Sequence, residues 1–362
     1  MGLAPASPKR VYGLAREKGK LVASQQGKTH RPGVSQKTSF KKQSGRSTKS
    51  SDSSHPRLSL AEFLILKKPT GDITVDVDGF AVALTSLDRI YWPKEKITKF
   101  DLLCYYVKIH DHILPFLENR PAILQRYPRG IEAPMFFQHD LESAPKYIKT
   151  KRMNNEEGRE IEYAVYTNLA SLLYLVNLGT IEQHPWNSTI QRLQRPDWIV
   201  IDLDPKDAPW KNVLTVALVA RELFNDRGLK AFVKTSGSSG IHLYLPLQPK
   251  YSYQAAAEFA ADLAREIASK APKLATIERT LVERAKQQVY VDWLQNAKGK
   301  SVAAPFTARA KPKATISMPL HWNQVENGVK IADFTIKNGP EWISKQGNPW
   351  ADFFISRQSL AL

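Results

Sequence analysis

The chain has 362 residues, enough to bury a full hydrophobic core in one large domain or two. Its 52 lysine and arginine residues outnumber its 35 acidic residues, and the net charge of +17 favours polyanionic partners, nucleic acid or an anionic membrane surface. The single cysteine, Cys104, excludes an intrachain disulfide framework, and the absence of a visible apolar span or secretory signal predicts a cytoplasmic protein.

Residues 1–55 form a basic low-complexity segment that holds 12 lysine or arginine residues and 2 acidic ones. Because so few of its side chains are apolar, burial cannot offset the entropy cost of ordering it, and we predict a disordered arm. Two roles stay open for this arm. It either holds nucleic acid through the phosphates or is a linker from a longer polypeptide.

Residues 56–362 are predicted to form one folded domain, which begins with a hairpin and a long helix. Strands over 73–77 and 80–84 flank Asp78-Gly79, a dipeptide typical of two-residue hairpin turns. Thr98 can cap a helix that runs to Leu117, and Cys104 in its apolar stretch is expected to be a core residue.

Strands and helices are mixed in the rest of the chain. We predict strands over 122–127, 160–165, 180–184, 198–204, 230–235, 241–246 and 288–294, and helices over 168–177, 211–225, 252–270 and 274–283. The tail after residue 320 is expected to be helical. Two adjacent strands around a tight loop favour an α+β fold with a central mixed or antiparallel sheet flanked by helices.

The stretch Asp-Trp-Ile-Val-Ile-Asp-Leu-Asp-Pro, from Asp197 to Pro205, predicts a buried strand that ends at the proline. Side chains alternate along a strand, so Asp202 and Asp204 share one face at its C-terminal end. Two neighbouring carboxylates repel each other unless a cation lies between them, and a third acid would complete a two-metal phosphoryl-transfer site. Taken alone, such a motif is more often turn chemistry or a solvated edge, and it also occurs in sugar-nucleotide transferases.

A second motif, Lys-Thr-Ser-Gly-Ser-Ser-Gly-Ile-His, runs from Lys234 to His242. Gly237 and Gly240 permit positive φ and bring N–H groups close to an anion, to which Ser236 adds a hydroxyl. His242 opens the next strand and can face the same anion, whereas Lys234 is either a point charge or a solvated flank. A plain hairpin connection with a satisfied histidine remains the alternative.

A third motif, Val-Tyr-Val-Asp-Trp, places Asp292 on the opposite face from Val291 and Trp293. A buried carboxylate is costly unless it is paired or bound to metal. An arginine partner would satisfy it, but with Asp202 and Asp204 in the same chain a third metal ligand is the favoured interpretation.

The order of these three motifs resembles the archaeo-eukaryotic primase superfamily, and within it the polymerase domain of bacterial ligase D, an end-joining repair enzyme. The resemblance covers roughly residues 56–362 and implies a primase-like fold. Further matching stretches begin at Leu84 (Leu-Thr-Ser-Leu-Asp-Arg-Ile-Tyr), Arg120 (Arg-Pro), Phe136 (Phe-Phe), His184 (His-Pro-Trp), Leu294 (Leu-Gln-Asn), Ala304 (Ala-Pro-Phe-Thr-Ala-Arg) and Trp350 (Trp-Ala-Asp-Phe-Phe-Ile-Ser-Arg-Gln-Ser-Leu).

The resemblance also implies the site residues. As catalytic residues it gives three aspartates that hold two divalent metal ions, Mn²⁺ or Mg²⁺, and these are Asp202, Asp204 and Asp292. As nucleotide-binding residues it gives Ser236, His242, Arg309, Arg284, His184 and Phe137, the last by stacking on a base. As the grip on the 5′-phosphate of a DNA end it gives Arg89 and Lys99.

Some positions depart from the family pattern. Gln138-His139 stands where an acid or amide followed by lysine is common, Gln125 stands where lysine is frequent, and one extra residue separates Arg284 from Asp292. These departures predict a weaker or differently shared grip on DNA or nucleotide. Of Phe136 and its neighbour Phe137, one is expected to pack inside and the other to be exposed.

The resulting hypothesis is a template-directed nucleotidyltransferase that extends 3′ ends at DNA breaks or gaps during non-homologous end joining. The resemblance implies a preference for ribonucleotides and for manganese, and in-line attack of a 3′-OH on the α-phosphate with metal assistance. The implied partners are 5′-phosphorylated DNA ends, nucleoside triphosphates, Ku and an ATP-dependent DNA ligase, at a nucleoid-associated location without a membrane. The alternatives are a primer-independent primase, a catalytically silent DNA-end binding module and a metal-dependent glycosyltransferase.

Overall fold

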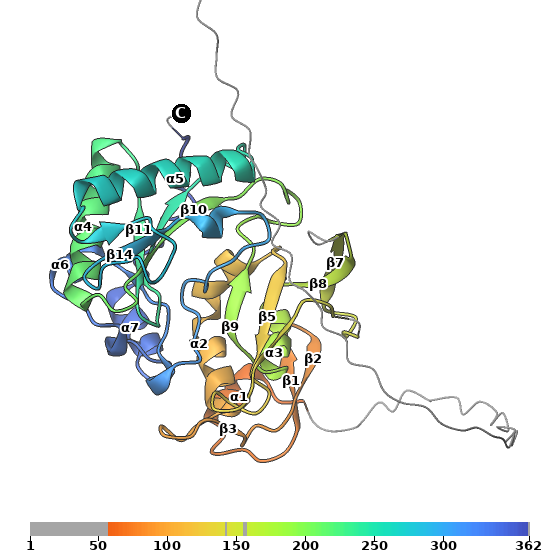
Figure 1. The fold of residues 1–362 in the computed structure, drawn as a ribbon. Helices are drawn as coiled ribbons and strands as arrows, with labels where there is room; N and C mark the ends of the chain where they lie inside the picture. The colour runs from red at the N-terminus through yellow and green to blue at the C-terminus, as the bar shows by residue number, and fades with distance from the viewer. Residues whose placement is uncertain (1–56, 142, 155–157, 361–362) are drawn as a thin grey trace, which may run out of the picture. The chain divides into compact units, whose positions relative to one another are not determined.

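A six-stranded sheet is the central element of the described residues, which in this computed structural model are 57–141, 143–154 and 158–360 (Figure 1). The predicted arm over residues 1–55 lies outside them. The strand order is β13-β14-β10-β12-β11-β15; β13 and β14 run parallel, and the other neighbours run antiparallel. In chain order these strands are β10 (Trp198–Asp204), β11 (Phe232–Thr235), β12 (Ile241–Pro246), β13 (Ala275–Thr276), β14 (Val289–Asp292) and β15 (Pro319–Leu320).

A second, three-stranded antiparallel sheet has the order β6-β5-β9. Its strands are β5 (Ala122–Arg126), β6 (Phe136–Gln138) and β9 (Thr180–Pro185). Three hairpins accompany it, formed by β1 (Ile73–Val77) with β2 (Phe80–Leu84), β3 (Ile90–Trp92) with β4 (Ile97–Thr98), and β7 (Lys149–Asn154) with β8 (Glu160–Val165). The first hairpin confirms the prediction made from Asp78-Gly79.

Seven α-helices occur in the described ranges: α1 (Leu60–Ile65), α2 (Lys99–Leu117), α3 (Leu169–Asn177), α4 (Trp210–Asp226), α5 (Tyr253–Lys270), α6 (Trp322–Glu326) and α7 (Gly339–Gln346). Helices α4 and α5 pack on the six-stranded sheet, whereas α2 and α3 pack on each other and on β9 (Figure 1). Helix α2 begins as predicted, because the Thr98 hydroxyl accepts the Asp101 N–H and the Asp101 carboxylate accepts the Thr98 N–H. None of the helices in these ranges is long and apolar enough to cross a bilayer.

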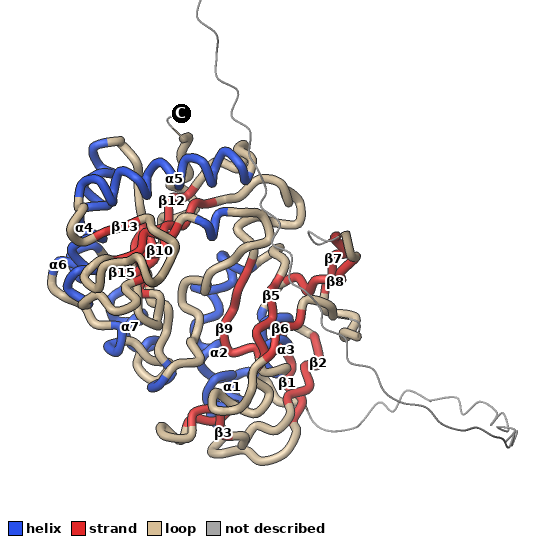
Figure 2. Tube along the Cα trace, in the orientation of Figure 1, coloured by secondary structure: helices blue, strands red, loops and turns tan. Residues whose placement is uncertain are grey.

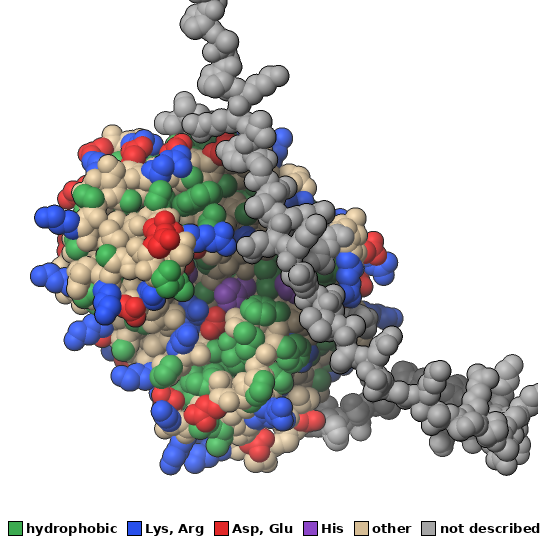
Figure 3. All heavy atoms as spheres, in the orientation of Figure 1, with side chains coloured by type: hydrophobic (Ala, Val, Ile, Leu, Met, Phe, Trp, Pro, Cys, Tyr) green, Lys and Arg blue, Asp and Glu red, His purple; other side chains and the backbone are tan. Residues whose placement is uncertain are grey.

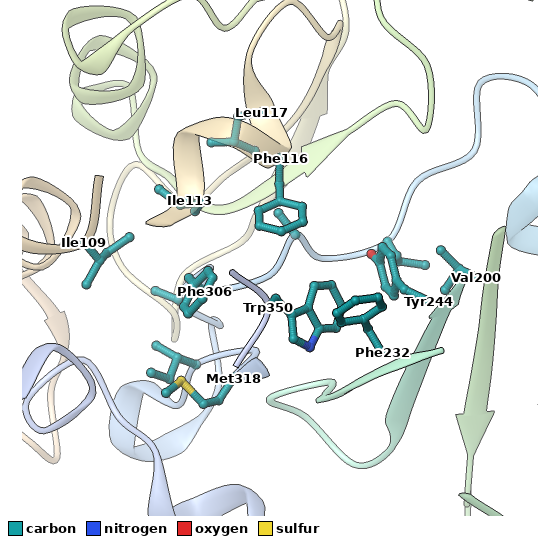
Figure 4. Close-up of a cluster of buried hydrophobic side chains, with 14 of the residues drawn as sticks. Ile109, Ile113, Phe116, Leu117, Val200, Phe232, Tyr244, Phe306, Met318 and Trp350 are labelled. Carbon is teal, nitrogen blue, oxygen red and sulfur yellow. The ribbon is translucent and has the colours of Figure 1, made fainter. Parts of the chain in front are cut away.

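Aromatic side chains fill the space where α2 meets the six-stranded sheet and the C-terminal segment (Figure 4). Trp350 lies 5.1 Å, between ring centroids, from Tyr244 of β12 and 5.7 Å from Phe116 of α2. Val200 of β10 belongs to the same buried cluster. The C-terminal segment therefore covers the face of the sheet that carries Val200 and, farther along β10, the two aspartates.

Two expectations about secondary structure are wrong. Residues 274–283 do not form a helix: Ala275 and Thr276 pair with β14, and turns follow (Figure 2). The tail after residue 320 is helical only in α6, α7 and a 3₁₀ turn. In the first case the hydrogen bonds offered by the sheet edge replace those of a local helix, which is a tertiary effect that periodicity does not contain.

Candidate active site

Three neighbouring strands bring the predicted acids and His242 side by side on one face of the sheet. Asp202 of β10 is paired in register with Asp292 of β14 on one side and with His242 of β12 on the other. Asp204 lies two residues along β10 and so projects from the same face. The His242 Nε2 atom is 3.4 Å from the Asp202 Oδ1 atom. Acids from segments ninety residues apart in the chain thus meet at one strand end.

The carboxylates destabilise one another's charged form. Burial, followed by the negative charges of Asp292 and Asp204, raises the pKa of Asp202 to about 7. The two Asp292 oxygens accept hydrogen bonds from the Leu294 N–H at 2.8 Å and from the Gln295 side-chain amide at 2.9 Å. Among the described residues no three His, Cys, Asp or Glu side chains form a ready-made metal group. The donor chemistry nevertheless fits a hard divalent cation, which prefers carboxylate oxygens and would relieve this repulsion.

The loop between β11 and β12 curls around the Ser236 hydroxyl. Its oxygen accepts the N–H groups of Ser238, Ser239 and Gly240 at 3.1, 3.2 and 2.9 Å, which leaves the hydroxyl hydrogen available to a ligand. Of the two glycines that permit positive φ, Gly237 uses that freedom, with a φ of 67°, and Gly240 does not. Gly240 is required by close approach instead, because a Cβ there would lie 2.2 Å from the Leu203 carbonyl oxygen.

Glu182 of β9 holds two of the predicted nucleotide-binding residues. Its Oε2 atom is 3.1 Å from His184 Nε2 and 3.0 Å from Arg309 Nε, and its Oε1 atom accepts the Ala310 N–H. Burial raises the pKa of Glu182, but the His184 hydrogen bond and the Arg309 charge outweigh it and lower the pKa to about 2. Arg309 also donates to the Ser236 carbonyl. This arginine therefore links β9 to the loop between β11 and β12 (residues 236–240), here called the serine loop.

His242 is held by the lysine at the start of the same motif. Lys234 is fully buried, so its interpretation as a solvated flank is wrong, and its Nζ atom is 2.8 Å from His242 Nδ1. Burial, then the charges of Lys234 and Arg309, lower the pKa of His242 well below its usual value. The ring is therefore neutral at physiological pH.

A cavity of about 260 Å³ lies between β9 and the six-stranded sheet; Asp292 is not among the residues that line it. Six of the predicted metal- or nucleotide-binding residues line it, namely His184, Asp202, Asp204, Ser236, His242 and Arg309. Histidine side chains are visible near the middle of the face drawn in Figure 3, with hydrophobic side chains below them. Gln295 and the segment 301–303 also line the cavity and were not selected from the sequence, although Gln295 belongs to the matching stretch that begins at Leu294.

Arg284 lies in a neighbouring cavity with Pro205 and Lys206, outside the cavity that Asp202 and Asp204 line. Its guanidinium donates to the carbonyls of Glu278 and Arg279 and lies over the Tyr290 ring, 3.8 Å from the centroid. Tyr290 is paired with Asp204, so Arg284 lies beside the acids without facing the serine loop.

Both phenylalanines of β6 are exposed, which corrects the expectation that one packs inside. Phe136 is 45% and Phe137 55% exposed. The Arg126 guanidinium lies 5.3 Å from the Phe136 ring centroid, and the His139 ring is nearly parallel to Phe137 at 6.4 Å. The strand therefore presents flat aromatic surfaces on which unpaired bases could stack.

Arg89 and Lys99 lie together at the start of α2, away from the cavity residues in sequence. The Lys99 N–H donates to the Arg89 carbonyl, and the Lys99 amino group donates to the Thr85 carbonyl at 2.7 Å. Burial, then the charge of Arg89, lower the pKa of Lys99 to about 8, and Arg126 adds a smaller contribution. Arg126 is thus a third cation near this pair.

The chain has clear relatives among known proteins. The family model described as "LigD, primase-polymerase domain" matches residues 98–350. The "Bifunctional non-homologous end joining protein LigD" of Bacillus subtilis is 35% identical over 279 residues, which cover 76% of this chain and 44% of that protein. The "Multifunctional non-homologous end joining protein LigD" of Pseudomonas aeruginosa is 28% identical over 284 residues, which cover 77% of this chain and 34% of that protein. The chain thus spans less than half the length of these curated relatives.

A solved structure agrees in fold with about three quarters of the chain. The "Polymerase Domain from Mycobacterium tuberculosis Ligase D in complex with DNA" superposes with a TM-score of 0.71 at 27% sequence identity, covering 76% of this chain and 99% of that one. This match confirms the predicted α+β, primase-like architecture with a mixed sheet. By sequence and by fold, the chain belongs to the LigD primase-polymerase domain family.

Proposed function

We propose that the protein is a nucleotidyltransferase that adds nucleotides, ribonucleotides preferred, to 3′ ends at DNA breaks or gaps during non-homologous end joining. The observation that carries the proposal is the pairing of Asp202 with Asp292 on one side and with His242 on the other, where Asp202 and His242 line a polar cavity. Family membership supports the reaction class. Ku and an ATP-dependent DNA ligase are the proposed partners, and the proposed location is cytoplasmic and nucleoid-associated.

The proposed roles follow from charge and hydrogen bonding. Asp202, Asp204 and Asp292 would hold two divalent ions, which when bound supply charge neutralisation at the reacting phosphate. The Ser236 hydroxyl and the His242 ring would donate hydrogen bonds to the triphosphate of the incoming nucleotide, and Arg309 would offset its negative charge.

Other residues would hold the remaining parts of the substrates. His184, fixed by Glu182, would face the nucleotide sugar. Phe137 would stack on a base, and Arg89 with Lys99 would bind the 5′-phosphate of the downstream strand. Arg284 is proposed to approach the phosphates only after its loop changes the contacts with Glu278 and Arg279.

The test is incorporation on a gapped duplex with and without a downstream 5′-phosphate, with ribo- and deoxyribonucleotides compared in Mn²⁺ and Mg²⁺. Wild-type protein should extend the primer, and Asp202→Ala and Asp204→Ala should abolish extension while DNA binding persists. Extension by either variant at the wild-type rate would refute the role of the acids.

The same assay separates the alternatives. A primer-independent primase would make product on a single-stranded template without a primer. A silent end-binding module would bind 5′-phosphorylated ends with strong salt dependence and incorporate nothing. The exposed Phe136 and Phe137 favour a DNA-binding surface. Because all of these candidate functions require such a surface, the two residues do not discriminate between them.

A further inference from the structure

Tyr106 of α2 is a completely buried tyrosine that the proposed chemistry does not use. Its hydroxyl donates to the Ile181 carbonyl of β9 at 2.7 Å and accepts the Ala308 N–H at 3.1 Å. The Thr307 hydroxyl oxygen is a third neighbour at 2.9 Å. Burying a hydroxyl is costly unless it is hydrogen-bonded. The contacts of this hydroxyl therefore indicate what it holds in place.

The two backbone partners of this hydroxyl each directly precede a residue of the candidate site. Ile181 precedes Glu182 in β9, and Ala308 precedes Arg309. Glu182 and Arg309 form the ion pair in which the Glu182 Oε2 atom is 3.0 Å from the Arg309 Nε atom. The Tyr106 hydroxyl therefore fixes the spacing between β9 and the segment that carries Arg309, one residue away from this pair.

The segment 301–309 contains no helix or strand, so it gains little restraint from regular backbone pairing. An isolated bridge joins Ala308 to Ile316. Phe306 has a φ of 64°, which is uncommon for a bulky side chain, and its carbonyl accepts the hydroxyl of Tyr105, the neighbour of Tyr106 in α2. Two tyrosine hydroxyls of α2 thus hold the backbone of the residues that lead to Arg309.

We propose that Tyr106 is a positioning residue that holds Arg309 in the orientation in which its guanidinium offsets the charge of the triphosphate. The inference rests on the proposed function, which assigns the triphosphate to the cavity that Arg309 lines. In Tyr106→Phe protein the buried Ala308 N–H would lose its acceptor, and the segment would have to move to satisfy it. Arg309 is the next residue and would move with it.

The direct test is the hydrogen-exchange rate of the Arg309 Nε–H group in ¹⁵N-arginine-labelled protein without nucleotide, with the signal assigned by its loss in Arg309→Lys. This hydrogen should exchange slowly in wild-type protein, because Nε lies beside the buried Glu182 carboxylate. Tyr106→Phe should raise the rate about tenfold, the value of one lost hydrogen bond. An unchanged rate in Tyr106→Phe overturns the inference.

Tyr253→Phe is the matched control. It also removes a buried tyrosine hydroxyl, whose partner is the Ser188 hydroxyl at 2.8 Å, and neither residue lines the cavity. This variant should leave the exchange rate of Arg309 unchanged. A rise as large as that in Tyr106→Phe would show a general loosening of the fold and overturn the specific role of Tyr106.

The binding test is a double-mutant cycle in which ATP is titrated into the protein in the presence of Mn²⁺. Tyr106→Phe should raise the Kd for ATP about tenfold, and Tyr253→Phe should not change it. In Arg309→Gln protein the Tyr106 substitution should add no further loss. Additive losses would show that the hydroxyl acts through another part of the site and would overturn the proposal.

Thr307→Val tests the same contact from the segment side, with a side chain of similar shape. It removes the hydroxyl that lies 2.9 Å from the Tyr106 oxygen. The exchange rate and the Kd for ATP should both rise. If neither changes in Thr307→Val, the proposal is overturned even if Tyr106→Phe fails to fold.

The two readouts separate this inference from the proposed function. If wild-type protein binds no ATP while the exchange rate of Arg309 depends on Tyr106, the proposed function is refuted and the positioning of Arg309 is supported. If ATP binds and neither the rate nor the Kd responds to Tyr106→Phe, the role of Tyr106 alone is refuted.

Discussion

At the scale of single residues, the site depends on charged groups that burial pushes away from their usual ionisation. Asp202 and Lys99 are opposite cases. The pKa of Asp202 is raised, so the acid is harder to ionise, and the pKa of Lys99 is lowered, so the base is harder to protonate. In each case a ligand of opposite charge would reverse the shift. Each residue therefore gives a prediction in which pH and ligand act together.

Asp202→Asn should stabilise the metal-free protein at high pH. Because the folded state raises this pKa to about 7, the wild type loses stability as pH rises from about 4 through 7, and the asparagine variant does not. In EDTA the two proteins should have similar free energies of unfolding near pH 4, and above pH 7 the variant should be more stable by at most about 4 kcal/mol. Thermal melts across this pH range measure the difference.

Adding Mn²⁺ should then reverse that order, because the ion would stabilise the wild type by binding its three carboxylates. A variant that is equally stable or less stable at pH 8 in EDTA would contradict the repulsion among these acids. Asp207→Asn, an exposed acid near the same strand end, serves as the control.

The preference for 5′-phosphorylated DNA should weaken as pH rises through about 8. Lys99 is charged below the pKa of about 8 and loses its charge above it, whereas the phosphate stays dianionic. We expect the affinity ratio between 5′-phosphate and 5′-hydroxyl ends to fall about tenfold by pH 9.5, equivalent to one charged hydrogen bond. Fluorescence anisotropy measures this ratio.

Lys99→Met should lower the ratio at every pH and remove its pH dependence, whereas Arg89→Gln should lower the ratio and keep the dependence. A ratio that does not change with pH in the wild type would show that Lys99 does not contact the phosphate.

At the scale of elements, the site is made by strand pairing. The pairs β14–β10 and β10–β12 bring Asp292, Asp202 and His242 into one row, and the serine loop exists because β11 and β12 form a tight hairpin. The loop must pass close to the backbone of β10, and Gly240 makes that approach possible. A substitution at this glycine should therefore displace the β10 backbone between Asp202 and Asp204.

Gly240→Ala should destabilise the protein by roughly 1–3 kcal/mol, because its Cβ would collide with the Leu203 carbonyl, a backbone atom that cannot move without disturbing β10. Nucleotide binding should fall more than the loss in stability explains, since His242 and Asp202 are neighbours of the displaced atoms. Urea unfolding and nucleotide titration measure the two effects. Ser239→Ala, an exposed position in the same loop, should change stability little, and equal stability of the two variants would contradict the close approach.

At the scale of the whole domain, buried polar contacts join distant segments. Asp197, at the start of β10, pairs with Arg120 at 2.6 Å and with Arg357 of the C-terminal segment at 3.5 Å. The Arg120 guanidinium also lies 4.0 Å from the Trp198 ring centroid. One carboxylate thus ties the acid-bearing strand to the segment before β5 and to the chain end.

Asp197→Ala should cost about 3–5 kcal/mol of unfolding free energy, because it leaves the Arg120 charge buried without its partner. Asp352→Ala removes an exposed ion pair with Lys230 and should cost at most about 1 kcal/mol. Denaturant unfolding of both variants checks the contrast. Similar losses for the two would show that the buried pair is not what holds these segments together.

The sequence by itself determined what alternation, capping and turn chemistry can specify. It located β10 with Asp202 and Asp204 on one face, the Thr98 cap of α2 and the Asp78-Gly79 hairpin, because each depends on residues close together in the chain. The order of the motifs identified the family and the α+β fold.

Tertiary structure alone decided which segments meet. Four features depend on contacts between distant segments. They are the pairing of Asp292 with Asp202, the contact of the buried Lys234 with His242, the contact of Glu182 with His184, and the pairing of Ala275 with the edge of the sheet. The sequence left the role of Lys234 open, because a lysine beside a glycine-rich loop looks the same whether it faces water or the interior. Its environment is set by strands β12 and β15 that pack beside it, and no local pattern records them.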